Sequence, residues 1–228
     1  MVILGINAYH ADAAACVFVD GELVAAIEEE RLRRVKHWAG FPSAAIATCL
    51  RSAGLEIRDI DHVAVNRDPK ANFMRKIRFG VSNWRKFKDV LGKLNSARRA
   101  ERIDELVCSL DGFDSSGYKA RLHNIEHHRA HLASAFLVSP FEEAAVASID
   151  GFGDYVSTMW GHGHGNDIDI LDQVYIPHSL GIFYLAMTQF LGFMKYGDEY
   201  KVMGLAAYGR PSRLQEMEKI VRLAPKGK

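Results

Sequence analysis

The stretch AAACVFVDGELVAAIEEE, residues 13–30, places two apolar runs on either side of Asp20 and Gly21. An Asp-Gly pair between apolar runs is a strong signal for a two-residue β-hairpin turn. VILGIN, residues 2–7, adds a short apolar run before the hairpin. The sequence therefore predicts that three consecutive strands open the chain.

The same order of elements returns later. EEAAVASIDGFGDYVSTMWGHGHG, residues 142–165, predicts a strand, a tight polar turn and a second strand, and IDILDQVYI, residues 168–176, supplies a third. The glycine-rich end of the first stretch, WGHGHG at 160–165, is predicted to be a hairpin loop. Between the triplets the patterns predict helices at 41–55 and 127–140 and strands at 61–67 and 120–126. The apolar run at 179–193 predicts a further helix with its aromatic side chains in a core.

Two strand triplets separated by helices predict an α/β fold. The order is that of the duplicated βββαβα architecture found in actin, sugar kinases and heat-shock ATPases, which is ribonuclease H-like and here stops within its second half. In that fold the first turns of the two triplets face a cleft that binds phosphate and metal. Each triplet carries acidic residues beside that turn: Asp12 in the first, and Asp150 and Asp154 in the second.

Length and composition indicate a soluble globular protein. The chain has 228 residues, of which 48% are hydrophobic, so that it can bury a sizeable core. The N-terminus has no basic region before its apolar run, and no apolar stretch approaches the length of a membrane span. We therefore expect a cytoplasmic protein without a membrane partner. The three cysteines, Cys16, Cys49 and Cys108, are widely spaced and are expected to be reduced.

The net charge of +1 hides a basic segment. From Lys70 to Arg102 there are eleven Lys or Arg and two acidic residues, a net charge of +9, which leaves about −8 for the remainder. Apolar residues recur there at intervals of three or four and predict an amphipathic helical insertion at about 69–106. We expect its charges to be solvated. Nucleic acid is an unlikely partner, because the aromatic residues fall on the apolar stripe instead of among the basic ones.

Two histidines and an aspartate predict a metal site. On a helix His127 and His131 project from one face, whereas His128 points about 100° away. Asp150, at the end of a following strand, can add a carboxylate. An i,i+4 pair of histidines is often incidental, but here it lies between two phosphate-type turns. Two imidazoles and a carboxylate suit Fe(II), Mn(II) or Zn(II).

Three stretches together resemble the carbamoyltransferases of the nodulation-protein, cephamycin and tobramycin type. They are LGINAYHADAAACVFVDGELVAAIEEERLRRVKH at 4–37, HHRAHLASAFLVSPFEEAAVASIDGFGD at 127–154 and GDEYKVMGLAAYG at 197–209. The resemblance implies an N-terminal actin-like domain, followed in the family by a YrdC-like domain that makes carbamoyl adenylate from ATP and carbamoyl phosphate. The N-terminal domain then moves the carbamoyl group to a hydroxyl of a sugar or natural product.

The resemblance also implies roles for individual residues. It makes His127, His131 and Asp150 ligands of a divalent metal, expected to be iron, and it puts the fourth ligand beyond Lys228. Lys36 is placed at the active site, although the charged run at 28–37 also fits a solvated edge. Asp12 and His10 are candidates for the base that takes the proton of the acceptor hydroxyl. In some family members the histidine directly precedes the aspartate, whereas here Ala11 lies between them. Carbamoyl-adenylate binding is expected of Lys201, Glu199, Gly204, Gly151 and Asp154.

Several questions stay open at this level. We place a first subdomain at 1–125 and a second at 126–228, with the YrdC-like domain outside this chain, and we expect the chain to be inactive by itself. A threonylcarbamoyl-transfer protein acting on tRNA and a non-catalytic nucleotide-binding module remain alternatives. The sequence does not name the acceptor, because acceptor pockets are shaped by loops that motifs do not encode.

Overall fold

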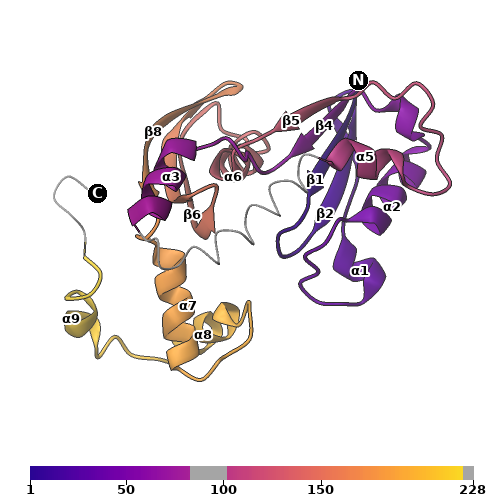
Figure 1. The fold of residues 1–228 in the computed structure, drawn as a ribbon. Helices are drawn as coiled ribbons and strands as arrows, with labels where there is room; N and C mark the ends of the chain where they lie inside the picture. Colours follow the sequence, from indigo (N-terminus) through magenta and orange to yellow (C-terminus); the bar gives the residue numbers. More distant parts are fainter. Residues whose placement is uncertain (83–101, 223–228) are drawn as a thin grey trace. The chain divides into compact units, whose positions relative to one another are not determined.

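The computed structural model of the protein describes residues 1–82 and 102–222. The chain divides into a larger unit, residues 1–179, and a smaller one that begins at Leu180. The larger unit contains two sheets, one of five strands and one of three (Figure 1). We describe the two units separately.

The first sheet has the strand order β3-β2-β1-β4-β5. Its strands are β1 (Val2–Asn7), β2 (Ala14–Val19), β3 (Glu22–Glu28), β4 (His62–Val65) and β5 (Arg121–Asn124). The first three strands pair antiparallel, and β1, β4 and β5 pair parallel. Asp20 and Gly21, between β2 and β3, both have positive φ, which is the conformation of a type I′ turn. The predicted hairpin is confirmed.

One face of this sheet is covered by helices. They include α1 (Glu29–Arg33), α2 (Ser43–Ala53) and α5 (Ile103–Cys108), and a single 3₁₀ turn spans Ile57–Asp59. Apolar side chains of α2 at the spacing of one helix face pack against alternate residues of the strands. The fully buried large side chains of this core are Leu4, Val17, Ile46, Leu50, Ile57, Val63, Ile103 and Val107. Gly54 ends α2 in the left-handed conformation that glycine adopts readily.

A buried glutamate caps α2 from a distance. Pro42 precedes α2 and offers no side-chain cap. The Glu29 carboxylate, which is 0% exposed, takes over this role by accepting hydrogen bonds from the backbone N–H groups of Ala44, at 3.2 Å, and Ala45, at 2.6 Å. Arg33 Nε donates to the same carboxylate at 2.6 Å. Glu29 therefore does not belong to a solvated edge, because its charge satisfies the N–H groups at a helix N-terminus.

The second sheet has the order β6-β7-β8 and is antiparallel throughout. Its strands are β6 (Glu143–Gly153), β7 (Val156–His164) and β8 (Asp167–Tyr175). Helix α6 (His127–Phe136) buries Leu132 and Phe136 against this sheet. The prediction of a loop at 160–165 was wrong, since β7 continues through His164. The glycines of this stretch are needed because neighbouring groups approach β7 closely.

Gly161 and Gly163 illustrate that close approach. A Cβ added to Gly161 would lie 2.3 Å from the Asp169 carbonyl oxygen, and one added to Gly163 would lie 2.8 Å from the Phe136 ring. Real Cβ contacts are not that short, so side chains at these positions would force β8 and α6 away. The glycines are therefore a packing requirement of a strand rather than the signature of a turn.

The smaller unit contains α7 (Leu180–Phe190), α8 (Glu199–Ala206) and α9 (Leu214–Met217). The prediction that the aromatic side chains of 179–193 lie in a core was wrong for Tyr184 and Phe190, whereas Phe183 and Phe193 are partly buried. Within this stretch Phe190 is 81% exposed and Tyr184 39% exposed, and the buried residue of α7 is Thr188. A segment this short cannot bury much of its own apolar surface. Among the described residues no helix is both long and apolar enough to cross a membrane.

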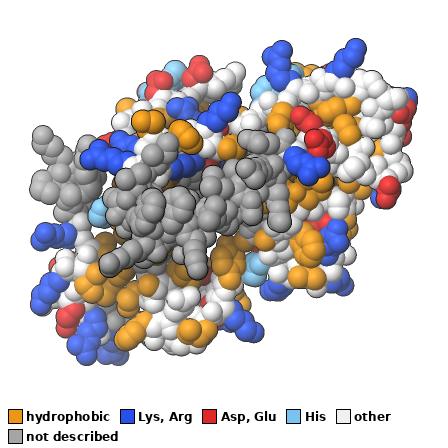
Figure 2. All heavy atoms as spheres, in the orientation of Figure 1, with side chains coloured by type: hydrophobic (Ala, Val, Ile, Leu, Met, Phe, Trp, Pro, Cys, Tyr) orange, Lys and Arg blue, Asp and Glu red, His pale blue; other side chains and the backbone are white. Residues whose placement is uncertain are grey.

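The order of elements confirms the predicted architecture. Three strands, α2, β4, α5, β5 and α6 form the first repeat, and β6, β7, β8 and α7 begin a second one. The basic insertion predicted at about 69–106 is described only at its two ends, by α3 (Phe73–Ser82) and α5, and residues 83–101 lie outside the described part. On the face drawn in Figure 2 the described Lys and Arg side chains are dispersed. The subdomain boundary at 125/126 remains a prediction.

Replacing Glu29 tests the distant cap. We expect Glu29→Ala to lower the free energy of unfolding by about 3 kcal/mol, because Arg33 and two helix N–H groups lose their partner. Glu28→Ala is the matched control, since the Glu28 side chain is 44% exposed; it should change stability by no more than about 0.5 kcal/mol. Urea denaturation of both variants measures the difference. Equal losses in the two variants would contradict the capping role.

Candidate metal centre and adjoining loops

Two imidazoles from one turn of α6 point at the same place. His127 is the first residue of α6 and His131 lies one turn further, and their Nε2 atoms are 3.0 Å apart. Glu126 begins the helix, and its side chain accepts a hydrogen bond from the Arg129 N–H at 2.8 Å. The cap fixes where the helix starts, and thereby fixes the direction of both rings. The His127 side chain is 9% exposed and that of His131 is 48% exposed.

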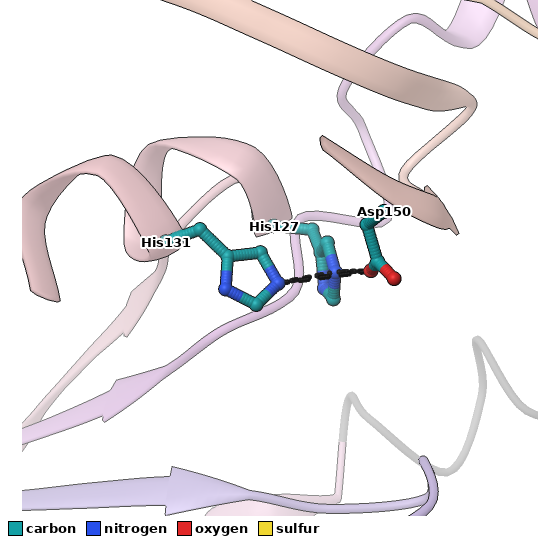
Figure 3. Close-up of side chains that lie close together, drawn as sticks. All are labelled: His127, His131 and Asp150. Carbon is teal, nitrogen blue, oxygen red and sulfur yellow. Dashed lines mark hydrogen bonds and ion pairs between the residues drawn. The ribbon is translucent and has the colours of Figure 1, made fainter. Parts of the chain in front are cut away.

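Asp150 approaches the two rings from β6. Its Oδ2 lies 2.9 Å from His127 Nε2 and 3.7 Å from His131 Nε2 (Figure 3). The β6–β7 register shifts between Ile149 and Gly153, so that Asp150 lies in a β-bulge. A bulge redirects a side chain that a regular strand would aim elsewhere. The hydrogen bond from His127 and the nearby His131 ring hold the pKa of Asp150 far below its usual range, and the Asp150 carboxylate in turn raises the pKa of His131.

The three donor atoms fit a divalent metal ion. Bonds of about 2.1 Å from one ion to imidazole nitrogen and carboxylate oxygen place neighbouring donors about 3 to 3.5 Å apart. The observed separations are 2.9, 3.0 and 3.7 Å. Two nitrogens and one oxygen suit Fe(II), Mn(II) and Zn(II). The structure thus brings together the three residues predicted as ligands.

Gly153 makes room for the His127 ring. A Cβ added to Gly153 would lie 2.0 Å from Cγ and 2.1 Å from Cδ2 of His127. The backbone of the bulge therefore touches the ring itself. Gly151 lies in the same bulge, where its N–H donates to Asp150 Oδ1 at 2.6 Å. Its predicted part in nucleotide binding is not tested by these contacts.

The Asp154 carboxylate ties three segments together. Its Oδ2 accepts hydrogen bonds from the N–H of Asp68, at 2.7 Å, and from the N–H of His127, at 3.1 Å. Its backbone oxygen accepts from the Asn72 side chain at 3.1 Å. These contacts anchor the start of α6 to the β6–β7 turn. Nucleotide binding by Asp154 stays a prediction, and the contacts give this residue a positioning role.

His128 has a separate, structural role. It is 0% exposed, its Nε2 donates to the Val156 carbonyl oxygen at 3.0 Å, and its Nδ1 pairs with Ser148 Oγ at 2.9 Å. Burial lowers the pKa of His128, so the ring is neutral at pH 7. It joins α6 to the second sheet and, as its position on the helix predicted, does not point at the metal centre.

His10 and Asp12 lie on the loop after β1. The rings of His10 and His127 have centroids 5.7 Å apart, which places His10 beside the metal centre. Asp12 Oδ1 lies 2.8 Å from Nδ1 of His37, a residue that the sequence did not single out. The Asn7 side chain donates to the backbone oxygens of Ala11 and Asp12, at 3.4 and 2.9 Å, and fixes the loop. The structure therefore offers a carboxylate–imidazole pair in addition to the predicted candidates.

The backbone in these loops is held in an unusual conformation. Of the eight described non-glycine residues with positive φ, four lie in the two segments that meet here: Tyr9, Asp12, Arg34 and His37. Such residues cost on the order of 1 to 3 kcal/mol each and tend to cluster at functional sites. Backbone hydrogen bonds from Tyr9 to Gly40 and from Ala13 to Trp38 hold the segments together. In the sequence, the signal for this carboxylate–imidazole pair is His37, which directly follows the predicted Lys36.

Lys36 is exposed and lines a shallow hollow of about 320 Å³ together with Glu30, Arg31 and Arg34. A larger cavity of about 610 Å³ lies over small side chains of β1, β2 and β3, and Asn7 and Ala130 are part of its wall. Neither hollow is lined by the His127–His131–Asp150 cluster. The candidate metal centre is therefore defined by its three donor atoms, and neither hollow marks it.

The remaining predicted residues lie in the smaller unit, on α8. Lys201 forms an ion pair of 2.6 Å with the buried Asp198, which raises the pKa of Lys201. The Glu199 backbone oxygen accepts a hydrogen bond from the Tyr184 hydroxyl at 3.1 Å. A Cβ on Gly204 would meet nothing within 4 Å, so local packing does not require glycine there. The roles of Lys201, Glu199 and Gly204 in nucleotide binding stay predictions.

Comparison with known proteins gives consistent matches. A family model described as "Carbamoyltransferase N-terminus" matches residues 2–226. An uncharacterized protein of Synechocystis is 38% identical over 219 residues, which are 92% of this chain and 35% of that protein. The nodulation protein NolNO of Sinorhizobium fredii is 36% identical across 90% of this chain and 29% of its own length. The chain thus spans about a third of the length of these curated relatives.

Among solved structures, YeaZ from Pseudomonas aeruginosa is similar with a TM-score of 0.40 and 14% sequence identity. The similarity covers 78% of this chain and 68% of YeaZ. The fold assignment rests on the strand order instead of on this likeness.

Gly153→Ala tests how closely the bulge must approach His127. The added methyl group would collide with the imidazole, so we expect metal affinity to fall by at least about tenfold, as for changes that misorient a ligand. We expect a loss of stability on the order of 1 to 3 kcal/mol from overpacking. Calorimetric titration with Zn²⁺ and urea denaturation measure the two effects. Gly204→Ala, where an added Cβ meets open space in α8, is the matched control: metal affinity should stay at the wild-type value, and stability should not fall, because Ala is favoured over Gly in a helix interior. A Gly153→Ala protein with wild-type metal affinity would refute the fit.

Proposed function

The chain belongs to the carbamoyltransferase N-terminal family, and from that premise we propose that it is the transfer half of an O-carbamoyltransferase. In this proposal a carbamoyl group moves from carbamoyl adenylate to a hydroxyl of a sugar or natural product. The observation that carries the proposal is the convergence of His127, His131 and Asp150 beside the loop that holds Asp12. The adenylate would come from ATP and carbamoyl phosphate through a YrdC-like domain outside this chain.

The cluster supports binding of the adenylate end of the donor. His127, His131 and Asp150 would hold a divalent metal, for which iron is our expectation by family. When bound, the ion supplies positive charge for the phosphate of the donor.

The acceptor hydroxyl must lose its proton as it attacks the carbamoyl carbon. The Asp12–His37 pair is the arrangement that usually serves for this: a carboxylate orients an imidazole, and the imidazole takes the proton. His10, beside His127, is the second candidate base. As the new bond from oxygen to carbon forms, the bond from the carbamoyl carbon to the phosphate oxygen breaks, and AMP leaves with the bonding electrons.

Lys36 is placed to balance negative charge. Three cationic side chains line one hollow, namely Arg31, Arg34 and Lys36. Glu30 lines the same hollow and also lies beside the Asp12–His37 pair, where its carboxylate accepts a hydrogen bond from the His37 N–H. Cations that face developing negative charge lower the barrier of an acyl transfer. We propose this role for Lys36 at the phosphate or at the oxyanion. Lys201, in the smaller unit, is proposed for nucleotide binding by family resemblance.

Metal content tests the donor half of the proposal. We expect the double variant His127→Ala, His131→Ala to purify without the metal ion that wild type retains at this centre, and to bind AMP at least about tenfold more weakly, because two of the ligands are gone. Elemental analysis and calorimetry measure the two effects. His178→Ala replaces an exposed histidine and is the control. Wild-type metal content and AMP affinity in the double variant would rule out the assigned role.

Substitution of the carboxylate–imidazole pair tests the acceptor half. In an assay supplied with carbamoyl adenylate and an acceptor alcohol, we expect His37→Gln and Asp12→Asn each to lower kcat by about 10² to 10⁴, the usual contribution of a general base. The metal ion at the His127–His131–Asp150 centre should be retained, since neither residue belongs to that group. His123→Gln provides a control for histidine replacement elsewhere in the larger unit. An unchanged kcat in His37→Gln would transfer the role of base to His10.

A further inference from the structure

A second group of metal-binding side chains lies on the β6-β7-β8 sheet. His162 and His164 belong to β7 and Asp169 to β8. Their ligand atoms all lie within 4.8 Å of one another, and the two rings have centroids 5.5 Å apart. The side chains are 41%, 47% and 72% exposed. The group is thus accessible from solvent and has the ligand types of a metal site.

The sheet holds these side chains in place. Residues two apart on a strand point to the same face, so His162 and His164 project together. Gly161 and Gly163 alternate with them and allow close contact with the Asp169 backbone and with Phe136 of α6. The histidines therefore stand on a packed strand and not on a loop. Sites built on such elements are held more precisely than sites on loops.

Carboxylates surround the two imidazoles. Asp169 pairs across the ladder with His162, and its Oδ2 lies 3.0 Å from His164 Nε2. Glu143 pairs across the ladder with His164, and its Oε1 lies 2.8 Å from His162 Nε2. In the described part of the chain neither carboxylate has an ion pair with Lys or Arg. With neutral imidazoles the group carries negative charge that no described Lys or Arg pairs with.

We propose that His162, His164 and Asp169 bind a divalent transition-metal ion of the imidazole-preferring class, such as Zn²⁺, with the Glu143 carboxylate adjoining. Imidazole donors select this class over Mg²⁺ and Ca²⁺, which prefer oxygen. The bound ion would cross-link β7 and β8 near the turn that connects them. Because ions that bind only the folded state stabilise it, Zn²⁺ would raise the melting temperature through this site.

The proposed site is separate from the His127–His131–Asp150 centre. Ile149, next to Asp150, pairs with Thr158, and His162 lies four residues further along β7. At roughly 3.3 Å per residue this places the two sites about 13 Å apart along the strand. One ion cannot serve both. The inference is also independent of the proposed transfer reaction, since none of its three ligands takes part there.

Titration of the 228-residue protein with Zn²⁺ alone tests this site. We expect the His127→Ala, His131→Ala protein to bind one equivalent fewer than wild type. Adding His162→Ala and His164→Ala should remove a second equivalent. Calorimetry gives the stoichiometry, and circular dichroism confirms that each variant is folded. Retention of the second equivalent after loss of His162 and His164 would overturn the proposal.

A comparison of two carboxylates on β8 tests the third ligand, Asp169. Asp167 and Asp169 lie on the same face of the strand, but only Asp169 belongs to the cluster. In the background without His127 and His131, Asp169→Asn should weaken Zn²⁺ binding by at least about tenfold, whereas Asp167→Asn should weaken it far less. Equal weakening would show general attraction to a negative surface and would contradict ligation. Mg²⁺ in equal concentration should not compete.

Discussion

The structure depends on the meeting of one helical turn with one β-bulge. His127 and His131 reach a common point because they are one turn apart on α6, and Asp150 reaches it because β6 departs from regular register there. Neither element is sufficient without the other. A regular β6 would aim Asp150 differently, and any side chain on residue 153 would push the His127 ring away. The centre is thus a product of tertiary packing, although its ligands come from two short stretches of sequence.

The surrounding contacts fix these two elements relative to each other. Asp154 binds the first N–H of α6, His128 binds Ser148 and the Val156 backbone, and Leu132 and Phe136 pack on the sheet. Metal ligands need such supporting contacts, because a small displacement of a ligand weakens a site by an order of magnitude or more. The first sheet follows a similar rule. There the buried Glu29 fixes the start of α2 through hydrogen bonds to Ala44 and Ala45.

Sequence patterns predicted those features that local chemistry determines. The Asp20-Gly21 turn, the amphipathic α2 and the i,i+4 pair of His127 and His131 each follow from short-range rules, and the order of elements then indicated the fold. The contacts of Glu29 with α2, of His37 with Asp12 and of Gly153 with His127 were not predictable in this way, because each partner lies at least fifteen residues away. For His162 and His164 the glycines suggested a turn. In the structure they serve the close packing of β7, which a pattern within one strand does not reveal.

Anomalous X-ray diffraction from crystals loaded with Fe(II) or Zn²⁺ tests the central claim most directly. The account predicts an anomalous peak about 2.0 to 2.2 Å from Nε2 of His127, Nε2 of His131 and a carboxylate oxygen of Asp150. A loaded crystal with its peaks elsewhere, and with these three side chains turned away from one another, would contradict it.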